Sequence, residues 1–338
     1  MFVKGIRALT YSEIRTWKQC RYRHELSYVK RYAANERASY FKRGSVVHRF
    51  IELMHTKKEE VKIDDLISQL RMEWIEEVRV GLLQELQART DGDNETSKEE
   101  DVVVVLSDDD KTELAVLEGM IRAYHKYYFL NNEFTGYLAE VEVTASIDDS
   151  VSWVKIDGIV KLNGAYWIHE IKTASSFSEN DRLLLNIDDQ SHHYLMTVKA
   201  KWPEKNFTGA IRTILKTPSI KQTKKETVDE YCERVIADYQ ERPDFYLRRF
   251  YVEKPQQMID EYRDYFKTIY KEIVLSTFAP KTPGTQTCCM CDFFGYCTEV
   301  DTSVKEEILK RDFYVRGSNH SNTSNFNNPI VQHNKQVA

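Results

Sequence analysis

Residues 151–173 read VSWVKIDGIVKLNGAYWIHEIKT, and this stretch decides the fold of the 338-residue chain. Two runs rich in β-branched and aromatic residues flank the dipeptide Asn163-Gly164, whose residues both tolerate a positive φ. The stretch therefore predicts a β-hairpin with a two-residue loop. In that register Leu162 pairs with Ala165, and counting outward from this pair predicts which residues face each other on the two strands.

The count places two carboxylates, Asp157 and Glu170, opposite each other. Like charges that face across strands destabilise a sheet, so the pair indicates a cation between them. Lys172 follows Glu170 by two residues, and the strand period of two turns it to the same face. The three residues form a candidate metal-binding and catalytic set. The alternatives are an exposed strand face with ordinary charges and a longer loop, which would shift the register.

A histidine upstream is a candidate for the same site. His48 ends the sequence RGSVVH inside a helix expected from about Arg43 to Lys58, beside an apolar stripe of the same helix. A neutral imidazole there is able to complete a metal's ligand shell. The alternatives are a helix-surface histidine and a separate metal site made with Glu52 and His55.

Gln190 and Tyr194 lie four residues apart in the sequence DQSHHYL, about twenty residues after the hairpin. Residues at this spacing share one face of a helix. The pair is a candidate for positioning either Lys172 or a DNA strand.

The cysteines indicate a second metal centre. Three of them form the pattern C-x2-C-x5-C near the C-terminus, and a fourth lies near the N-terminus: Cys288, Cys291 and Cys297, with Cys20. Four converging thiolates bind either an iron-sulfur cluster or a zinc ion, and free cysteines are the remaining alternative. Cys289 adjoins Cys288 and is able to replace it, whereas Cys232 lies in a helical pattern and is expected to pack in a core.

The charge of the chain is unevenly distributed. The net charge is −5, yet residues 1–43 contain eleven Lys and Arg against three Glu, and residues 199–225 contain eight against one Glu. Basic stretches interleaved with aromatic residues are able to follow a phosphate backbone and stack on bases, although a solvated helix face is an equal alternative. No apolar run approaches the roughly 20 residues that span a bilayer, and the first residues lack the apolar core of a signal peptide. We therefore expect a cytoplasmic protein without membrane contact.

A coarse pass along the chain predicts a helix from Tyr11 to Tyr32, a second helical region with a polar, acidic loop at residues 89–111, and strands from about residue 137. The expected organisation has five parts: an N-terminal helical segment (1–48), a helical insertion (49–135), a catalytic core (136–285), a cysteine segment (286–300) and a disordered tail (316–338).

Taken together in chain order, these motifs resemble the RecB-type PD-(D/E)xK nucleases that carry an iron-sulfur clasp, such as the AddB nuclease domain, the CRISPR-associated RecB-like exonucleases and their phage homologues. The motifs are Cys20, His48 in R-G-x-x-x-H, Asp157, Glu170-x-Lys172, Gln190-x3-Tyr194 and C-x2-C-x5-C. The resemblance covers roughly residues 12–297. Two features depart from the family pattern: Ile156 replaces the familiar proline before Asp157, and the acidic loop has no counterpart.

The resemblance implies a restriction-endonuclease-like α/β fold, with a central mixed sheet flanked by helices, a helical insertion and a cysteine-ligated cluster that joins the N- and C-terminal segments. It makes His48, Asp157, Glu170 and the Ile171 carbonyl ligands of Mg²⁺ or Mn²⁺, and Lys172 the group that orients the attacking water. Gln190 and Tyr194 would complete the catalytic set. The four cysteines of the pattern would hold a [4Fe-4S] cluster, with Zn²⁺ as the alternative.

The implied activity is hydrolysis of DNA phosphodiester bonds, with an exonuclease on single strands or free ends favoured over an endonuclease. A helicase, a recombination protein or a CRISPR adaptation protein is a candidate partner, and a phage-encoded protein would act in the host cytoplasm. The alternative is a non-catalytic DNA-binding or recombination subunit that uses the nuclease fold as a platform.

Overall fold

The structure is a computed structural model, and it describes residues 2–3, 6–35, 39–57, 62–89 and 104–317. Most of the expected acidic loop (residues 90–103) and almost all of the expected disordered tail (residues 318–338) lie outside the described residues. The acidic run at residues 108–110 is not part of a loop. It forms the first turn of a helix, where Ser107 caps the helix and Asp110 returns the bond to complete a capping box.

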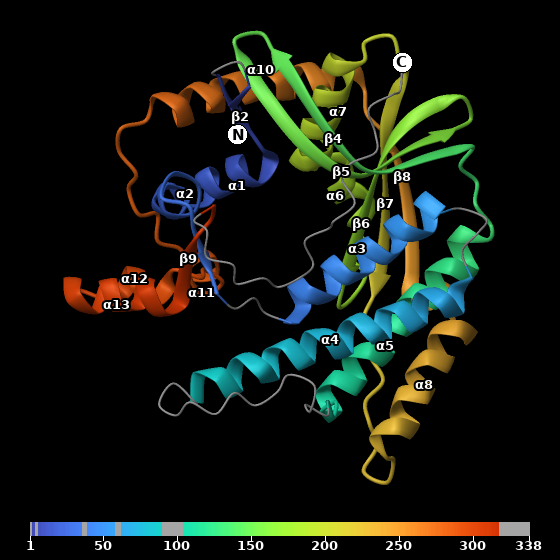
Figure 1. Cartoon of the computed structure of the whole chain (residues 1–338). Coiled ribbons are helices and arrows are strands. Elements are labelled where there is room, and N and C mark those ends of the chain that lie inside the picture. Colours follow the sequence, from blue (N-terminus) through green and yellow to red (C-terminus); the bar gives the residue numbers. More distant parts are fainter. Residues whose placement is uncertain (1, 4–5, 36–38, 58–61, 90–103, 318–338) are drawn as a thin grey trace.

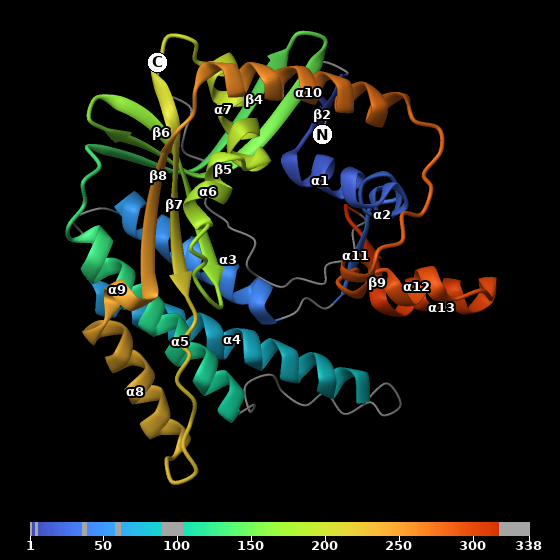
Figure 2. The same ribbon diagram turned by 180° about the vertical axis from the view of Figure 1, so that it is seen from behind.

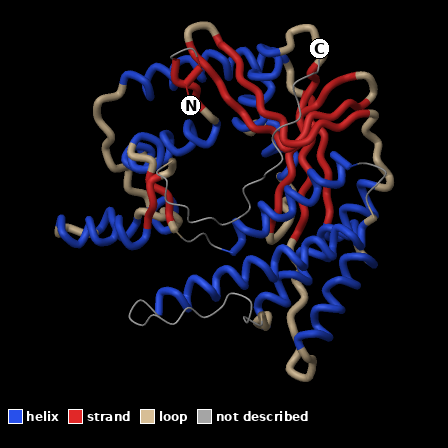
Figure 3. Tube along the Cα trace, in the orientation of Figure 1, coloured by secondary structure: helices blue, strands red, loops and turns tan. Residues whose placement is uncertain are grey.

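A seven-stranded mixed sheet forms the centre of the molecule (Figures 1 and 3). Its order is β1-β2-β5-β6-β7-β8, with β4 paired to β5; β2 runs parallel to β5 and β6 runs parallel to β7, and the other pairs are antiparallel. The strands are β1 (Phe2–Val3), β2 (Ile6–Leu9), β4 (Gly136–Ile147), β5 (Ser150–Leu162), β6 (Ala165–Ala174), β7 (Phe207–Lys216) and β8 (Leu247–Glu253). The expected mixed α/β fold is therefore confirmed.

Helices cover both faces of the sheet. One face packs against α7 (Asp189–Lys201) and α10 (Gln256–Leu275), through a core that includes Ile168, Leu195 and Phe266. The other face packs against α3 (Ser39–Lys57), α4 (Ile63–Arg89), α5 (Asp108–Tyr124) and α8 (Val228–Glu241), through a core that includes Ile171 and Phe50. Because helices cover both faces, even polar residues of β6 are buried: His169 is 0% exposed and Glu170 is 4% exposed.

The N- and C-terminal segments form a smaller lobe beside the sheet (Figure 2). It contains α1 (Tyr11–Gln19), α2 (Arg21–His24), the π-helix η1 (Glu25–Val29), α11 (Thr285–Cys289), α12 (Phe294–Thr298) and α13 (Thr302–Asp312). Strand β3 (Tyr32–Ala34) pairs with β9 (Phe313–Val315), so the segment after η1 lies beside the last described residues. The remaining helices are η4 (His125–Phe129), α6 (Asp181–Asn186) and α9 (Pro243–Tyr246).

The single helix expected from Tyr11 to Tyr32 is wrong. Cys20 adopts an extended conformation, with φ −162° and ψ 115°, and interrupts the helix between α1 and α2. After α2 the chain continues as the π-helix η1 and then as strand β3. The residues around Cys20 carry no proline or glycine, so local sequence gave no sign of the break.

Candidate active site

Strand β5 changes neighbours at the candidate site. Along one edge its first residues pair with β2, through Val151 and Ser152, and its last residues pair with β6, from Gly158 to Leu162. The stretch 153–157 between them has no strand partner on that edge within the described chain. Figure 1 shows β2 and β6 well apart from each other on either side of the middle of β5. A sheet that opens in its middle exposes side chains that a closed ladder would bury.

The hairpin has the predicted register. Asn163 and Gly164 have φ values of 50° and 80°, and Leu162 pairs with Ala165. The ladder ends at Gly158, one position before the expected facing pair of Asp157 and Glu170. There the Ile171 N–H donates instead to Asp157 Oδ2, at 2.8 Å. A side-chain hydrogen bond thus holds the two strands where their backbones separate.

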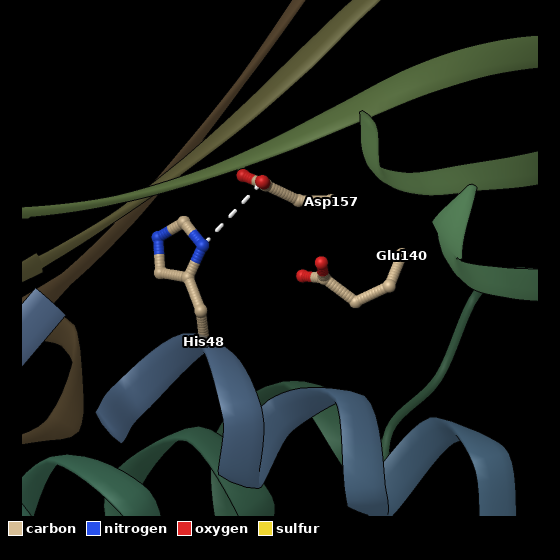
Figure 4. Close-up of side chains that lie close together, drawn as sticks. All are labelled: His48, Glu140 and Asp157. Atoms are coloured by element: carbon tan, nitrogen blue, oxygen red, sulfur yellow. Dashed lines mark ion pairs between the residues drawn. The ribbon is translucent and has the colours of Figure 1, made fainter. Parts of the chain in front are cut away.

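His48, Glu140 and Asp157 come together at this opening, from α3, β4 and β5 (Figure 4). One ligand atom of each lies within 4.8 Å of the others. His48 Nδ1 lies 3.4 Å from Asp157 Oδ1. The structure therefore brings His48 and Asp157 together, as the sequence suggested, and adds a carboxylate that the sequence reasoning missed.

Glu140 lies opposite Asp157, at a local distortion of β4. Its φ is 49°, whereas Ala139 and Val141 on either side pair regularly with Gly158 and Ile156 of β5. The signal for it lay in the sequence. A two-residue turn at Asp148-Asp149 pairs Ile147 with Ser150, and counting outward from that pair sets Glu140 opposite Asp157.

The pKa values in this group depend on burial and on the charges that lie close to each side chain. Burial alone would raise the pKa of Asp157, but His48, Lys172 and the Ile171 N–H outweigh it and hold that pKa below its ordinary value. Burial would lower the pKa of His48, yet the charge and hydrogen bond of Asp157 raise it. Burial, and then the charge of Glu140, raise the pKa of Glu52 one turn along α3. Carboxylates this close to one another favour a bound cation.

Glu170 lies beside this group and belongs to a second cluster. Arg212 on β7 donates to Glu170 Oε2 through Nε at 2.8 Å, and Lys172 Nζ lies 2.9 Å from Oε1. Glu170 is 4% exposed, and among the described residues its Oε1 accepts no hydrogen bond. An oxygen that is buried, ion-paired and still free to accept is suited to a metal or a water molecule. Arg212 is a further residue that sequence reasoning missed, because only the pairing of β6 with β7 reveals it.

Gln190 and Tyr194 form a chain of contacts to the lysine. Lys172 Nζ donates to Gln190 Oε1 at 3.4 Å, and Gln190 Nε2 donates to the Tyr194 hydroxyl at 2.9 Å. Both residues lie on α7, which packs over the face of β6 that carries Lys172. The structure thus places them against the lysine rather than apart from it.

The donor set fits a hard divalent cation. His48, Asp157 and Glu140 offer one imidazole and two carboxylates, and carboxylate oxygens are the ligands that suit Mg²⁺ and Mn²⁺. The proximity of the Asp157 and Glu140 carboxylates agrees with this. Glu170 lies outside this group of three. When bound, such an ion lowers the pKa of a water and neutralises charge on a phosphate. Lys172 and Arg212 supply fixed positive charge beside it.

The cysteines lie elsewhere, in the smaller lobe. Cys20, Cys288, Cys291 and Cys297 line one cavity of about 200 Å³ between α2 and the C-terminal segment. Among the described residues, no three cysteine sulfurs lie within 4.8 Å of one another. Cys289 is exposed and does not line the cavity, and Cys232 packs against the α5–α8 side of the core.

A mixed α/β sheet that opens beside an imidazole, carboxylates and a lysine defines a protein with a candidate divalent-metal site. The sequence model of the PD-(D/E)XK nuclease superfamily matches residues 8–298. The chain belongs to this superfamily, whose nucleases use divalent metal ions.

Two further comparisons add little. No curated protein matches the sequence. Among solved structures, the crystal structure of SSO0001 is similar, with 16% identity and a TM-score of 0.30 over 75% of this chain and 94% of that one. In the part of the chain that the structure describes, none of the helices combines the length and apolar character needed to cross a bilayer.

Proposed function

We propose that this protein is a metal-dependent deoxyribonuclease that cleaves phosphodiester bonds to leave a 5′-phosphate. The observation that carries the proposal is the opening of the β5–β6 hairpin, where His48 and Asp157 meet beside Glu170 and Lys172. Membership of the nuclease superfamily supports the same reaction.

Each residue has a role that follows from its position. His48, Asp157, Glu140 and Glu170 would hold the ion, and the Ile171 carbonyl remains a candidate ligand from the resemblance. Lys172, held by Gln190, would orient and help deprotonate the attacking water. Arg212 holds the Glu170 carboxylate in place, because a guanidinium that donates to a carboxylate forms a strong, charge-assisted hydrogen bond.

We further propose that the enzyme is a RecB-like exonuclease for single-stranded DNA or DNA ends, working with a helicase, a recombination protein or a CRISPR adaptation protein. This part rests on the ordered motifs from Cys20 to Cys297. It also fits a chain that contains no nucleotide-binding motif of its own for unwinding.

A [4Fe-4S] cluster at the four cysteines is the structural cofactor that we propose. Their shared cavity supports it, because a cubane binds one cysteine at each of its four irons and so needs ligands that stand apart. Zinc would require sulfurs about 3.8 Å from one another, given a tetrahedral site with Zn–S bonds of about 2.3 Å. Among the described residues, no three cysteine sulfurs lie within 4.8 Å of one another, which is wider than the spacing that zinc needs.

Cleavage of end-labelled DNA with Mn²⁺ tests the enzymatic proposal. Linear single strands should be degraded, duplexes more slowly, and circular single strands should survive if the enzyme needs an end. Lys172→Ala should lose at least about 100-fold in rate, whereas Lys161→Ala, an exposed lysine near the hairpin turn, should cleave normally. Equal cleavage by wild type and Lys172→Ala would reject the assignment, and binding without any cleavage by wild type would favour the non-catalytic DNA-binding subunit.

A further inference from the structure

Aromatic rings and cations gather at the end of the sheet where β6 and β7 finish. Phe177 follows β6, Lys216 ends β7, Phe245 lies in α9, and Arg242 and Arg248 flank that helix. We call these five residues the aromatic–cation platform. Figure 2 shows α9 beside the first residues of β8, at the end of the sheet near α8.

The cations lie over the rings. Lys216 Nζ is 3.3 Å from the ring centroid of Phe245 and 5.4 Å from that of Phe177. The Arg248 guanidinium carbon is 4.4 Å from the Phe177 centroid, and that of Arg242 is 4.7 Å from the Phe245 centroid. Both rings therefore sit in a field of positive charge.

That charge is poorly neutralised. Arg242 pairs with Asp238 at 2.6 Å, but within the described chain neither Arg248 nor the Lys216 ammonium has a carboxylate partner. Lys216 is only 8% exposed. Burial, followed by the charges of Arg248 and Arg242, lowers its pKa. A buried ammonium without a counter-ion is suited to an incoming anion.

The rings remain accessible. Phe245 is 41% exposed, Phe177 is half-buried, and Arg248 is exposed. The part of the Phe245 ring that stays exposed contributes no burial to folding. An exposed ring next to a cation does recognise a nucleotide, because the ring stacks on the base while the cation meets the phosphate.

The platform adjoins the candidate active site. In the parallel β6–β7 pair, Lys172 is opposite Ile214, and Ala174 is opposite Lys216. Lys216 is therefore offset from Lys172 by two residues along the strand direction and by one strand spacing, about 8 Å in all. The period of two turns both lysines to the same face of the sheet. A chain of a few nucleotides would bridge this distance.

We propose that the aromatic–cation platform binds single-stranded DNA next to the scissile phosphate, with Phe245 and Phe177 stacking on unpaired bases, Arg248 contacting a phosphate and Lys216 adding positive charge beneath the rings. The proposal deepens the proposed nuclease function and rests on it for the identity of the neighbouring site. A duplex keeps its bases stacked inside, so the platform selects single strands.

Binding of a fluorescent single-stranded oligonucleotide in EDTA, followed by anisotropy over a range of salt concentrations, tests the proposal without cleavage. Phe245→Leu should weaken binding about tenfold and leave the salt slope unchanged, because it removes a stacking contact and no charge. Arg248→Gln should reduce the slope of log affinity against log salt by about 0.7, the value for one phosphate contact. Neither change should alter binding of the duplex as strongly.

Two variants in the smaller lobe are matched controls: Tyr314→Leu, at an aromatic residue 39% exposed, and Arg311→Gln. Both should bind like wild type. The platform is rejected if Phe245→Leu binds single strands with wild-type affinity, if it weakens single strands and duplex equally, or if Arg248→Gln keeps the wild-type slope. If wild type cleaves no DNA but Phe245→Leu and Arg248→Gln weaken its binding as expected, the nuclease proposal is rejected and the platform is kept. If wild type cleaves DNA but both variants bind like wild type, the platform is rejected and the nuclease proposal is kept.

Discussion

Glu140 combines a backbone distortion with a position in the candidate metal site. The β4–β5 register sets it opposite Asp157, and its φ of 49° marks a local distortion of the strand at this position. A left-handed conformation costs a non-glycine residue of the order of 1 kcal/mol. Such a cost persists where the position serves a purpose, and ligation of a cation is the purpose that this geometry supports.

We predict that Glu140→Gln weakens binding of Mn²⁺ by about tenfold or more, since it removes one carboxylate from the group. Glu142→Gln is the matched control, because Glu142 lies on the same strand and is exposed. Isothermal titration calorimetry measures both. If Glu140→Gln binds Mn²⁺ like wild type while Asp157→Asn does not, Glu140 is not a ligand.

Among the elements, strand β5 pairs with three other strands, β2, β4 and β6, and these pairings differ in how far the sequence predicts them. The hairpin register was predictable because Asn163-Gly164 fixes it locally, within a few residues of the pairs that it sets. The pairing of β2 with β5 was not, because Ala8 meets Val151 across more than 140 residues and a four-residue strand has little periodicity of its own. The break at Cys20 and the contact of Arg212 with Glu170 were hidden for the same reason: both depend on distant partners.

Gly158 leaves room on β5 for the side chain of Tyr137. A Cβ there would lie 2.6 Å from the hydroxyl oxygen of Tyr137, which donates to or accepts from His169 Nδ1 at 2.9 Å and whose ring stacks on His55. Because this tyrosine is held from several sides, it cannot simply move away. The glycine therefore preserves a buried polar network directly behind Asp157.

We predict that Gly158→Ala lowers the free energy of unfolding by about 1–3 kcal/mol, the usual cost of overpacking. Gly81→Ala should do the opposite and raise it by about 0.5–1 kcal/mol, because Gly81 lies in α4 with no atom within 4 Å of the added carbon. Urea unfolding compares the two. Equal free energies of unfolding for wild type and Gly158→Ala would show that the Tyr137 side chain moves aside at little cost.

On the scale of the whole molecule, the two chain ends are joined by packing as well as by the cysteine cavity. Leu26, Phe293 and Phe313 form a small apolar cluster, the Tyr22 N–H donates to the Pro280 carbonyl, and β3 pairs with β9. A cofactor in the cavity would therefore reinforce an interface that already exists. The metal-dependent chemistry lies in the main sheet, so the two centres should be separable.

We predict that Cys20→Ser lowers the iron content of anaerobically purified protein and its melting temperature, because one of four ligands is lost. Cys232→Ser should keep both, since Cys232 lies against the helical core. Lys172→Ala should keep its iron and lose its cleavage. Colourless wild-type protein that contains zinc and no iron would remove the cluster and leave the nuclease proposal intact.

The whole protein should also lose stability in mild acid, because several histidines are buried in neutral form. Burial lowers the pKa of His55 to about 3, that of His193 to about 3 and that of His192 to about 4, and it holds the pKa of His169 well below its ordinary value. Below a pH of about 6.5 these histidines take up protons in the unfolded chain but stay neutral in the folded one. Their contribution to stability is therefore complete above that pH and is lost as the pH falls toward the folded-state values, by up to about 1.4 kcal/mol per pH unit for each.

His48 opposes this trend, because its pKa is raised in the folded state, but it is one residue against four. Carboxylates titrate mostly below about pH 4.5, so the interval from pH 7.5 to 5.5 isolates the histidines. We predict that urea unfolding in EDTA shows a free energy several kcal/mol smaller at pH 5.5 than at pH 7.5. An unchanged free energy over this interval would mean that the buried histidines gain access to water, and therefore that the core around Tyr137 and His169 opens more easily than its hydrogen bonds indicate.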